Sequence, residues 1–189
     1  MISIKGLTHG YDGKVILSSI DLSIKENGIY VIMGESGIGK TTLLNLIAGL
    51  ITPNSGEINT YGKKISYMFQ EARLLPWMSV IDNVNLVLGG GKSTREIAMA
   101  HLTDVGLGED LDKYPSDLSG GMAGRVSFAR TIAYDADIIL LDEPFNGIDR
   151  ANVMNMISII KKHQSDKIIV VVTHSEEYAE LLSDKKIQL

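Results

Sequence analysis

Short apolar runs separated by turn residues dominate the first third of the chain. Apolar and polar residues alternate there, which is typical of β-strands with one buried face. We predict strands over residues 2–7, 20–24 and 29–33, and two more in EINTY and KISYMF. The last two flank a turn at Tyr61-Gly62-Lys63. A helix is expected after the third strand, from Lys40 to about Gly49.

The pattern changes in the middle of the chain. VIDNVNLVL and TREIAMAHLTDVG suit helices, with GGGKS as a flexible surface connection between them, and a further helix begins just after Ser119. Nearer the C-terminus, DIILLD and KIIVVVT are almost uninterrupted apolar runs with a helical stretch between them, from Arg150 to about His163. Apolar strands joined by a helix predict a parallel sheet covered on both faces. KKIQL is expected to add a last short strand.

Length and composition fit one globular domain. The chain has 189 residues, of which 44% are hydrophobic and 22% are charged, enough for one well-buried core. We predict a single domain over residues 1–189. Residues 1–70 and 135–189 are expected to form its α/β core, and residues 71–134 a mainly helical insertion.

Charge and cysteine content exclude several functions. The net charge is -5 and no long basic run is present, so nucleic acid is not expected as a partner. The absence of cysteine excludes disulfide scaffolds, cysteine-ligated zinc and thiol catalysis. The first residues lack the pattern of a secretory signal, and apolar runs such as IIVVV are too short to span a bilayer. Any role at a membrane is therefore expected to go through a partner.

GESGIGKT fits the pattern G-x-x-x-x-G-K-[ST] and lies between a predicted strand and a predicted helix. That context favours a phosphate-binding loop, because glycines let backbone N–H groups approach phosphates and the helix N-terminus attracts anions. Lys40 would reach the β- and γ-phosphates and Thr41 would ligate Mg²⁺. The alternative is an ordinary glycine-rich turn. The expected nucleotide-binding residues of this loop are Gly34, Glu35, Ser36, Gly37, Ile38, Gly39, Lys40, Thr41 and Thr42.

Two acidic residues follow the apolar strand in DIILLDEPF. In parallel α/β sheets, ligands bind at the carboxyl ends of the strands. We therefore predict Asp142 as a metal carboxylate and Glu143 as a general base. The alternative is a solvated acidic turn with Pro144 ending the strand. His174 follows VVVT at the same expected edge, where it could contact a γ-phosphate, whereas the other three histidines are expected to be surface or packing residues (His9, His101 and His163).

DLSGGM is a second candidate anion site. Ser119 is a good N-cap, and Gly120 and Gly121 leave N–H groups exposed at the start of a helix. The alternative is simply a capped helix after a glycine turn. About eighty residues separate Lys40 from Ser119, so a second phosphate-binding motif needs an explanation.

Taken in order, GESGIGKT, Gln70, LSGGM, IILLDEP and His174 resemble the ATP-binding subunit of an ABC transporter. The resemblance covers almost the whole chain. It implies a P-loop NTPase core with a parallel sheet, an antiparallel N-terminal β subdomain and a mainly helical inserted lobe. It also implies that Tyr11 stacks on adenine, although a strand-end tyrosine is the alternative, and that Gln70 links Mg²⁺ to the lobe and acts with Lys40, Glu143 and His174 in catalysis.

The resemblance also explains the second motif. In this family two copies pack head to tail, so that Ser119, Gly120 and Gly121 complete the ATP site of the other subunit. Asp149 matches the aspartate of a loop that crosses between subunits. The motif departs from the usual pattern at Met122 and at Ala123-Gly124, and a glycine within a helix costs about 1 kcal/mol against alanine.

FQEARLLPWMSVIDNV is similar to the same segment in importers of nitrate, sulfonates and taurine. A transmembrane permease, with a solute-binding protein in the complex, is the implied partner, and the cytoplasmic face of the membrane is the implied location. A groove for a permease helix is expected at Leu74, Leu75, Trp77 and Met78, with packing inside the lobe as the alternative. A soluble ATPase of the same fold in a non-transport assembly remains possible at this point, whereas a P-loop kinase needs neither LSGGM nor His174.

Overall fold

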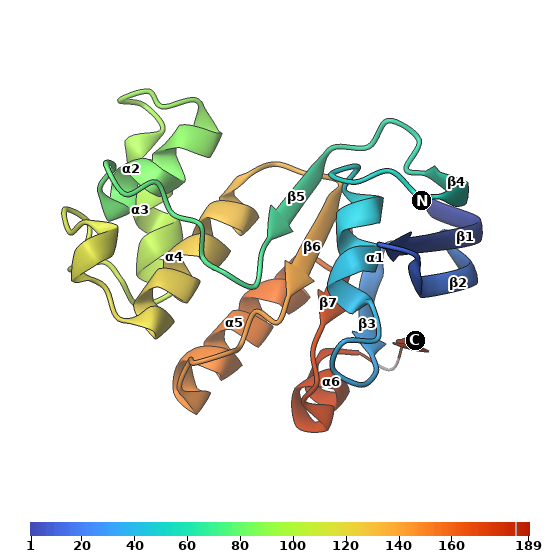
Figure 1. Ribbon diagram of the computed structural model, residues 1–189. Coiled ribbons are helices and arrows are strands. Elements are labelled where there is room, and N and C mark those ends of the chain that lie inside the picture. Colours follow the sequence, from blue (N-terminus) through green and yellow to red (C-terminus); the bar gives the residue numbers. More distant parts are fainter. Residues whose placement is uncertain (184) are drawn as a thin grey trace.

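Figure 1 shows the protein as a computed structural model that describes residues 1–183 and 185–189. Its centre is a parallel sheet of five strands in the order β5-β6-β7-β3-β8. Every residue of β6 and β7 is buried, because helices or the second sheet cover both faces. The predicted parallel sheet is therefore confirmed. Its strands are β3 (Gly28–Met33), β5 (Ile65–Met68), β6 (Ile138–Asp142), β7 (Ile168–Val172) and β8 (Lys186–Gln188).

A three-stranded antiparallel sheet lies beside the parallel one (Figure 1) and has the order β2-β1-β4. It confirms the predicted antiparallel subdomain, but two of its strands are longer than predicted. The register of β1 against β2 shifts three times along their length, and such bulges interrupt the alternation on which the prediction depended. The three strands are β1 (Ile2–Tyr11), β2 (Lys14–Ile24) and β4 (Ser55–Asn59).

Helix α1 (Lys40–Ile47) lies between the two sheets. Its buried leucines pack with one face of β6 and β7 and with β1 in a single apolar cluster. Alternate residues of the same central strands, such as Ile139 and Leu141, point to the opposite face, where a second cluster holds α5 (Arg150–Lys162) and α6 (Glu176–Leu182). The core therefore positions the amino end of α1 at the carboxyl edge of the parallel sheet.

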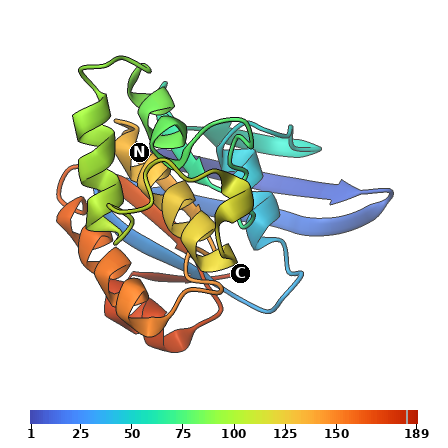
Figure 2. The same cartoon turned by 90° about the vertical axis from the view of Figure 1, so that its left-hand side faces the viewer.

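The remaining helices gather at the end of the molecule away from the antiparallel sheet (Figure 1) and face the viewer in Figure 2. The first predicted helix is divided, because α2 ends at Asn85 and the chain continues as a 3-10 turn, η1. We propose residues 71–134 as the extent of this helical lobe. Its elements are α2 (Val80–Asn85), η1 (Leu86–Leu88), α3 (Arg95–Asp104), η2 (Pro115–Asp117) and α4 (Gly120–Ala133).

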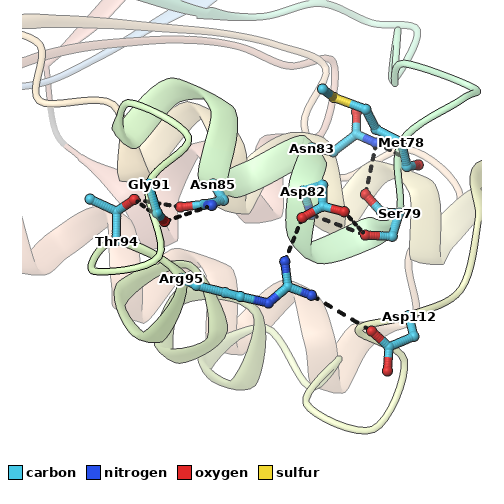
Figure 3. Close-up of polar contacts among 9 residues, drawn as sticks. All are labelled: Met78, Ser79, Asp82, Asn83, Asn85, Gly91, Thr94, Arg95 and Asp112. Atoms are coloured by element: carbon cyan, nitrogen blue, oxygen red, sulfur yellow. Dashed lines mark hydrogen bonds and ion pairs between the residues drawn. The ribbon is translucent and has the colours of Figure 1, made fainter.

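Polar side chains on α2 join the pieces of the lobe (Figure 3). The Asn85 side chain donates to Gly91 O at 3.1 Å and accepts from the Thr94 hydroxyl at 2.6 Å, which holds the middle of the GGGKS connection and the residue after it against the end of α2. Asp82 pairs with Arg95 of α3. Within the described residues, no helix is long and apolar enough to cross a membrane.

Candidate functional site

The loop between β3 and α1 has the shape expected of a phosphate-binding loop. Gly39 is the N-cap of α1 with φ 112°, a conformation that side-chain-bearing residues rarely adopt. A Cβ atom there would also lie 2.8 Å from side-chain carbons of both Ile16 and Leu17. Glycine is therefore required at this position by conformation and by close packing. Among the residues that the structure describes, no side chain caps α1, so its first N–H groups are available to bind an anion.

Lys40 is held ready by the same loop. Its ammonium donates to Gly34 O at 2.8 Å and to Glu35 O at 2.9 Å, and the residue is only 8% exposed. A buried ammonium satisfied by two carbonyls keeps a third donor position. The side chain is therefore placed to turn toward phosphate oxygens without leaving its pocket.

A pocket of about 270 Å³ brings most of the predicted site residues together. It also contains Ile16 and Val172, which the sequence analysis did not single out. Ile16 was missed because β2 begins earlier than predicted. Gly34, Glu35 and Ile38 do not line the pocket, although the first two hold Lys40. The predicted residues that line it are Tyr11, Ser36, Gly37, Gly39, Lys40, Thr41, Thr42, Gln70, Asp142 and Glu143.

Asp142 supplies the clearest sign of a cation site. It is 1% exposed, its Oδ2 accepts from the Tyr67 hydroxyl at 3.4 Å, and its Oδ1 has no hydrogen-bond partner among the described residues. Burial raises the pKa of this carboxyl, against the effect of the nearby Thr41 and Tyr67 hydroxyls and of Lys40. An unpaired buried carboxylate oxygen beside a hydroxyl fits Mg²⁺, which binds through one or two protein oxygens and keeps water and phosphate ligands.

Glu143 lies immediately after β6 in a constrained conformation. Its φ is 48°, which is uncommon for a non-glycine residue and costs about 1–3 kcal/mol. Its N–H donates to Val172 O at 3.0 Å, which fixes the backbone against β7. Its carboxylate lies 2.9 Å from Nδ1 of His174. A second pocket, of about 410 Å³, places these two side chains with Ser36, Lys40, Gln70 and Asn146.

The structure does not bring the second motif to the Lys40 pocket. A separate hollow of about 510 Å³ is lined by Ser119, Gly120, Gly121, Met122, Arg125 and residues 146–149. Ser119 is the N-cap of α4, and its hydroxyl accepts from the N–H of Met122 at 3.3 Å. The two candidate anion sites of one chain are therefore distinct surfaces.

Asp149 also lines this hollow but already has a local role. It is the N-cap of α5, and its carboxylate accepts from the N–H and the side-chain amide of Asn152. These hydrogen bonds hold the pKa of Asp149 below its usual value. Asn146, which lines both this hollow and the Glu143–His174 pocket, was missed because nothing in the sequence distinguishes it from a turn residue.

The segment after Gln70 contains one strongly exposed aromatic side chain. Trp77 is 71% exposed, whereas Leu74 packs against the main core. Leu74 therefore packs inside the protein, and a permease groove at Leu74, Leu75, Trp77 and Met78 stays a prediction.

Of the remaining histidines, His9 is buried and packs edge-on against Tyr11, with 4.9 Å between ring centroids. Burial lowers the pKa of both His101 and His163.

Comparison with known proteins agrees with this geometry. The family described as ABC transporter matches residues 17–146. The chain is 38% identical over 195 residues to the aliphatic sulfonates import ATP-binding protein SsuB 1 of Rhodococcus jostii (strain RHA1), covering 100% of this chain and 78% of the relative. It is 39% identical over 190 residues to SsuB 3 of Paraburkholderia xenovorans (strain LB400), covering 97% and 74%.

A solved structure gives the same result. The dimeric ATP-binding cassette MJ0796, in a post-hydrolysis state bound to ADP and Pi, is 29% identical. It superposes with a TM-score of 0.89 over 99% of this chain and 96% of the other. The P-loop NTPase fold predicted from the sequence is confirmed, and the chain belongs to the ABC transporter family.

Proposed function

We propose that the chain is the ATP-hydrolysing subunit of a membrane importer for a small solute and that it works as a head-to-tail dimer. One observation carries the proposal: a single pocket holds Lys40, Thr41, Asp142 and Glu143, which are the groups that ATP hydrolysis needs. The family relationship makes ATP the nucleotide, and the sulfonate-import names of the relatives suggest the type of transport.

Each residue of the pocket has a distinct proposed task. Lys40 exchanges its carbonyl partners for β- and γ-phosphate oxygens, and Tyr11 stacks on adenine. Thr41, Asp142 and Gln70 would hold Mg²⁺, which when bound neutralises charge on the phosphate oxygens. The loop N–H groups of residues 34–42 bind the remaining oxygens.

Glu143 acts as the general base of this proposal. Its carboxylate accepts a proton from the attacking water while the phosphates are held in place. His174 lies within hydrogen-bond distance of that carboxylate and orients it, with its other ring nitrogen available to the γ-phosphate. Phosphoryl transfer depends mainly on the placement of the reacting groups and on neutralisation of the phosphate charge. The residues of the pocket provide both.

The dimer supplies what one chain lacks. Ser119, Gly120 and Gly121 lie in their own hollow, so in the proposed assembly they close over the γ-phosphate bound to the other copy. Asp149 lies beside them and would face the same junction. The dimeric state of the MJ0796 cassette supports pairing of two such chains. ATP drives this closure only through tighter binding to the closed form.

Transport is favoured over a non-transport assembly because the relatives are named as import proteins. The proposed partners are a transmembrane permease and, in the same complex, a solute-binding protein. The proposed location is the cytoplasmic face of the membrane, held by the permease. Trp77 and its neighbours, Leu75 and Met78, are the proposed contact.

Two measurements test the proposal. The purified chain should hydrolyse ATP only with Mg²⁺, and Lys40→Ala should abolish turnover. Tagged chain isolated from membranes of its own source should bring with it a permease encoded beside it. If the chain hydrolyses ATP but no permease is isolated with it, the non-transport assembly is favoured. If the dimer does not hydrolyse ATP, the proposal itself is contradicted.

A further inference from the structure

Arg130 joins α4 to the segment that follows Gln70. One guanidinium nitrogen donates to Ala72 O at 3.0 Å and another to Arg73 O at 3.1 Å. The side chain is partly buried, and burial lowers its pKa. A fork of donors that satisfies two successive carbonyls fixes both the position and the direction of that piece of backbone.

The same segment is held at two further points. Asn83, which is fully buried, accepts from Leu75 N at 2.8 Å, and its amide donates to the carbonyls of Leu75, Met78 and Ser79. The contact with Met78 and Ser79 is visible in Figure 3. Arg73 itself has φ 43°, a conformation that persists only where surroundings hold it. Residues 72–79 are therefore clamped between α4 and α2.

Helix α4 connects the clamped segment to the second anion motif, because Arg130 and Ser119 lie toward opposite ends of it. Ser119 caps the amino end of this helix, and eleven residues at 1.5 Å each put Arg130 about 16 Å further along the axis. Near Arg130, the Ser66 hydroxyl of β5 donates to Thr131 O at 2.8 Å. The carboxyl end of α4 is thus tied to both the core strand and the backbone after Gln70, while its amino end carries the second anion motif.

We propose that Arg130 is a positioning residue that couples the two nucleotide sites of the dimer. A shift of Gln70 at one nucleotide displaces residues 72 and 73, Arg130 carries that displacement to α4, and the helix moves Ser119 at the other nucleotide. This inference rests on the proposed dimeric ATPase. It adds a named physical link between Gln70 and Ser119 in one chain.

Trp77 makes the clamp directly measurable, because it is the only tryptophan of the chain and lies inside the clamped segment. Arg130→Met keeps most of the buried stem but removes the guanidinium. In the nucleotide-free protein we expect Trp77 anisotropy to fall by about a third, because the released loop gains nanosecond motion. The Trp77 anisotropy of Arg130→Lys should lie between that of the parent and that of Arg130→Met, since one ammonium cannot reproduce the two-pronged hydrogen bonding of the guanidinium.

Arg125 provides a matched control on the same helix. It also donates to two carbonyls, those of Val105 and Gly106, but these belong to the end of α3 and not to the Gln70 segment. Arg125→Met should leave Trp77 anisotropy at the parental value. An equal drop in both methionine variants, or parental anisotropy in folded Arg130→Met, would overturn the clamp.

The coupling itself is read from turnover. In Arg130→Met dimers the Hill coefficient for ATP should fall toward 1 and kcat by about tenfold, because displacements near 1 Å are enough for such losses. Nucleotide affinity of the monomer should stay within about twofold, since Arg130 does not touch the Lys40 pocket. An unchanged Hill coefficient would overturn the coupling, whereas a parent without any turnover would instead contradict the proposed ATPase.

Discussion

Nδ1 of His174 lies 2.9 Å from Oε2 of Glu143, although 31 residues separate them in the chain. The contact exists because β6 and β7 are neighbours in the parallel sheet and end at the same edge. The two side chains differ in exposure, at 12% for Glu143 and 69% for His174. The carboxylate is therefore fixed in the pocket, while the imidazole covers it from the solvent side.

Glu143→Gln tests the assignment of the base. The amide keeps the shape of the side chain but cannot accept a proton from water, so turnover should fall by at least about 100-fold. ATP binding should persist, and the protein should accumulate as a dimer in gel filtration with ATP. Glu180→Gln, which changes an exposed carboxylate on α6 that lies near Lys186, should retain parental turnover. Normal hydrolysis by the Glu143 variant would show that another group is the base.

Gly120 and Gly121 form a matched pair for the half-site hypothesis. A Cβ atom on Gly121 would lie 2.8 Å from Gly147 O, whereas one on Gly120 meets no atom of residues 1–183 and 185–189 within 4 Å. Gly121→Ala should therefore cost about 1–3 kcal/mol of unfolding free energy, and Gly120→Ala less than about 0.5 kcal/mol. If the other copy's nucleotide docks here, Gly120→Ala should still reduce turnover about tenfold or more.

Nucleotide affinity of the monomer separates this explanation from its alternative. Gly120→Ala and the bulkier Ser119→Arg should leave that affinity nearly unchanged in a fluorescent-nucleotide titration at low protein concentration. A large loss of monomer affinity would mean that both anion motifs serve one nucleotide, contrary to the separate hollow in which they lie.

Asp142→Asn should raise the stability of the nucleotide-free protein and weaken its Mg²⁺-dependent nucleotide binding. The pKa of the buried Asp142 carboxyl is raised, so the folded protein binds more protons than the unfolded chain between its two pKa values. The contribution of the Asp142 carboxyl to the free energy of unfolding is fully present below the pKa that it has in the unfolded chain, about 3.9. That contribution is lost as pH rises through the higher pKa of the carboxyl in the folded protein. At pH 7 without nucleotide, Asp142→Asn should therefore be more stable by about 1–2 kcal/mol, with the gain vanishing at low pH.

Calorimetry across pH measures this gain, and Mg²⁺-dependent nucleotide binding measures the loss of function. Asp137→Asn is a suitable control, because Asp137 pairs with Lys63 at the surface and its pKa is lowered. That variant should gain no stability at pH 7. A destabilised Asp142→Asn protein would show that the carboxylate is satisfied in the nucleotide-free state.

The sequence predicted best where local pattern and tertiary environment agree. Strands β6 and β7 are apolar at nearly every position and are buried throughout, so their pattern predicts buried parallel strands and no other element. The start of β2 was not found, because the bulges in its pairing with β1 break the alternation. The first lobe helix is shorter than predicted, since Asn85 bonds across to Thr94 and Gly91.

The candidate site shows a similar division. The loop around Lys40 follows a spacing that backbone geometry imposes, so it could be found from sequence. The positive φ of Glu143 could not, because neighbouring strands and not the residue type hold it there. Arg130 was missed for another reason: its partners are backbone carbonyls 57 and 58 residues away, and carbonyls leave no mark in a sequence.

Gly124→Ala should stabilise the protein. Gly124 lies inside α4, where glycine costs about 1 kcal/mol against alanine because it loses more backbone freedom on folding. An added Cβ would lie 3.5 Å from the terminal methyl of Ile148, an ordinary van der Waals distance, and the helical backbone accepts alanine. Urea unfolding should therefore show a gain of about 0.5–1 kcal/mol with an unchanged m-value. A loss of stability would mean that α4 depends on a closer approach to Ile148 than the structure shows.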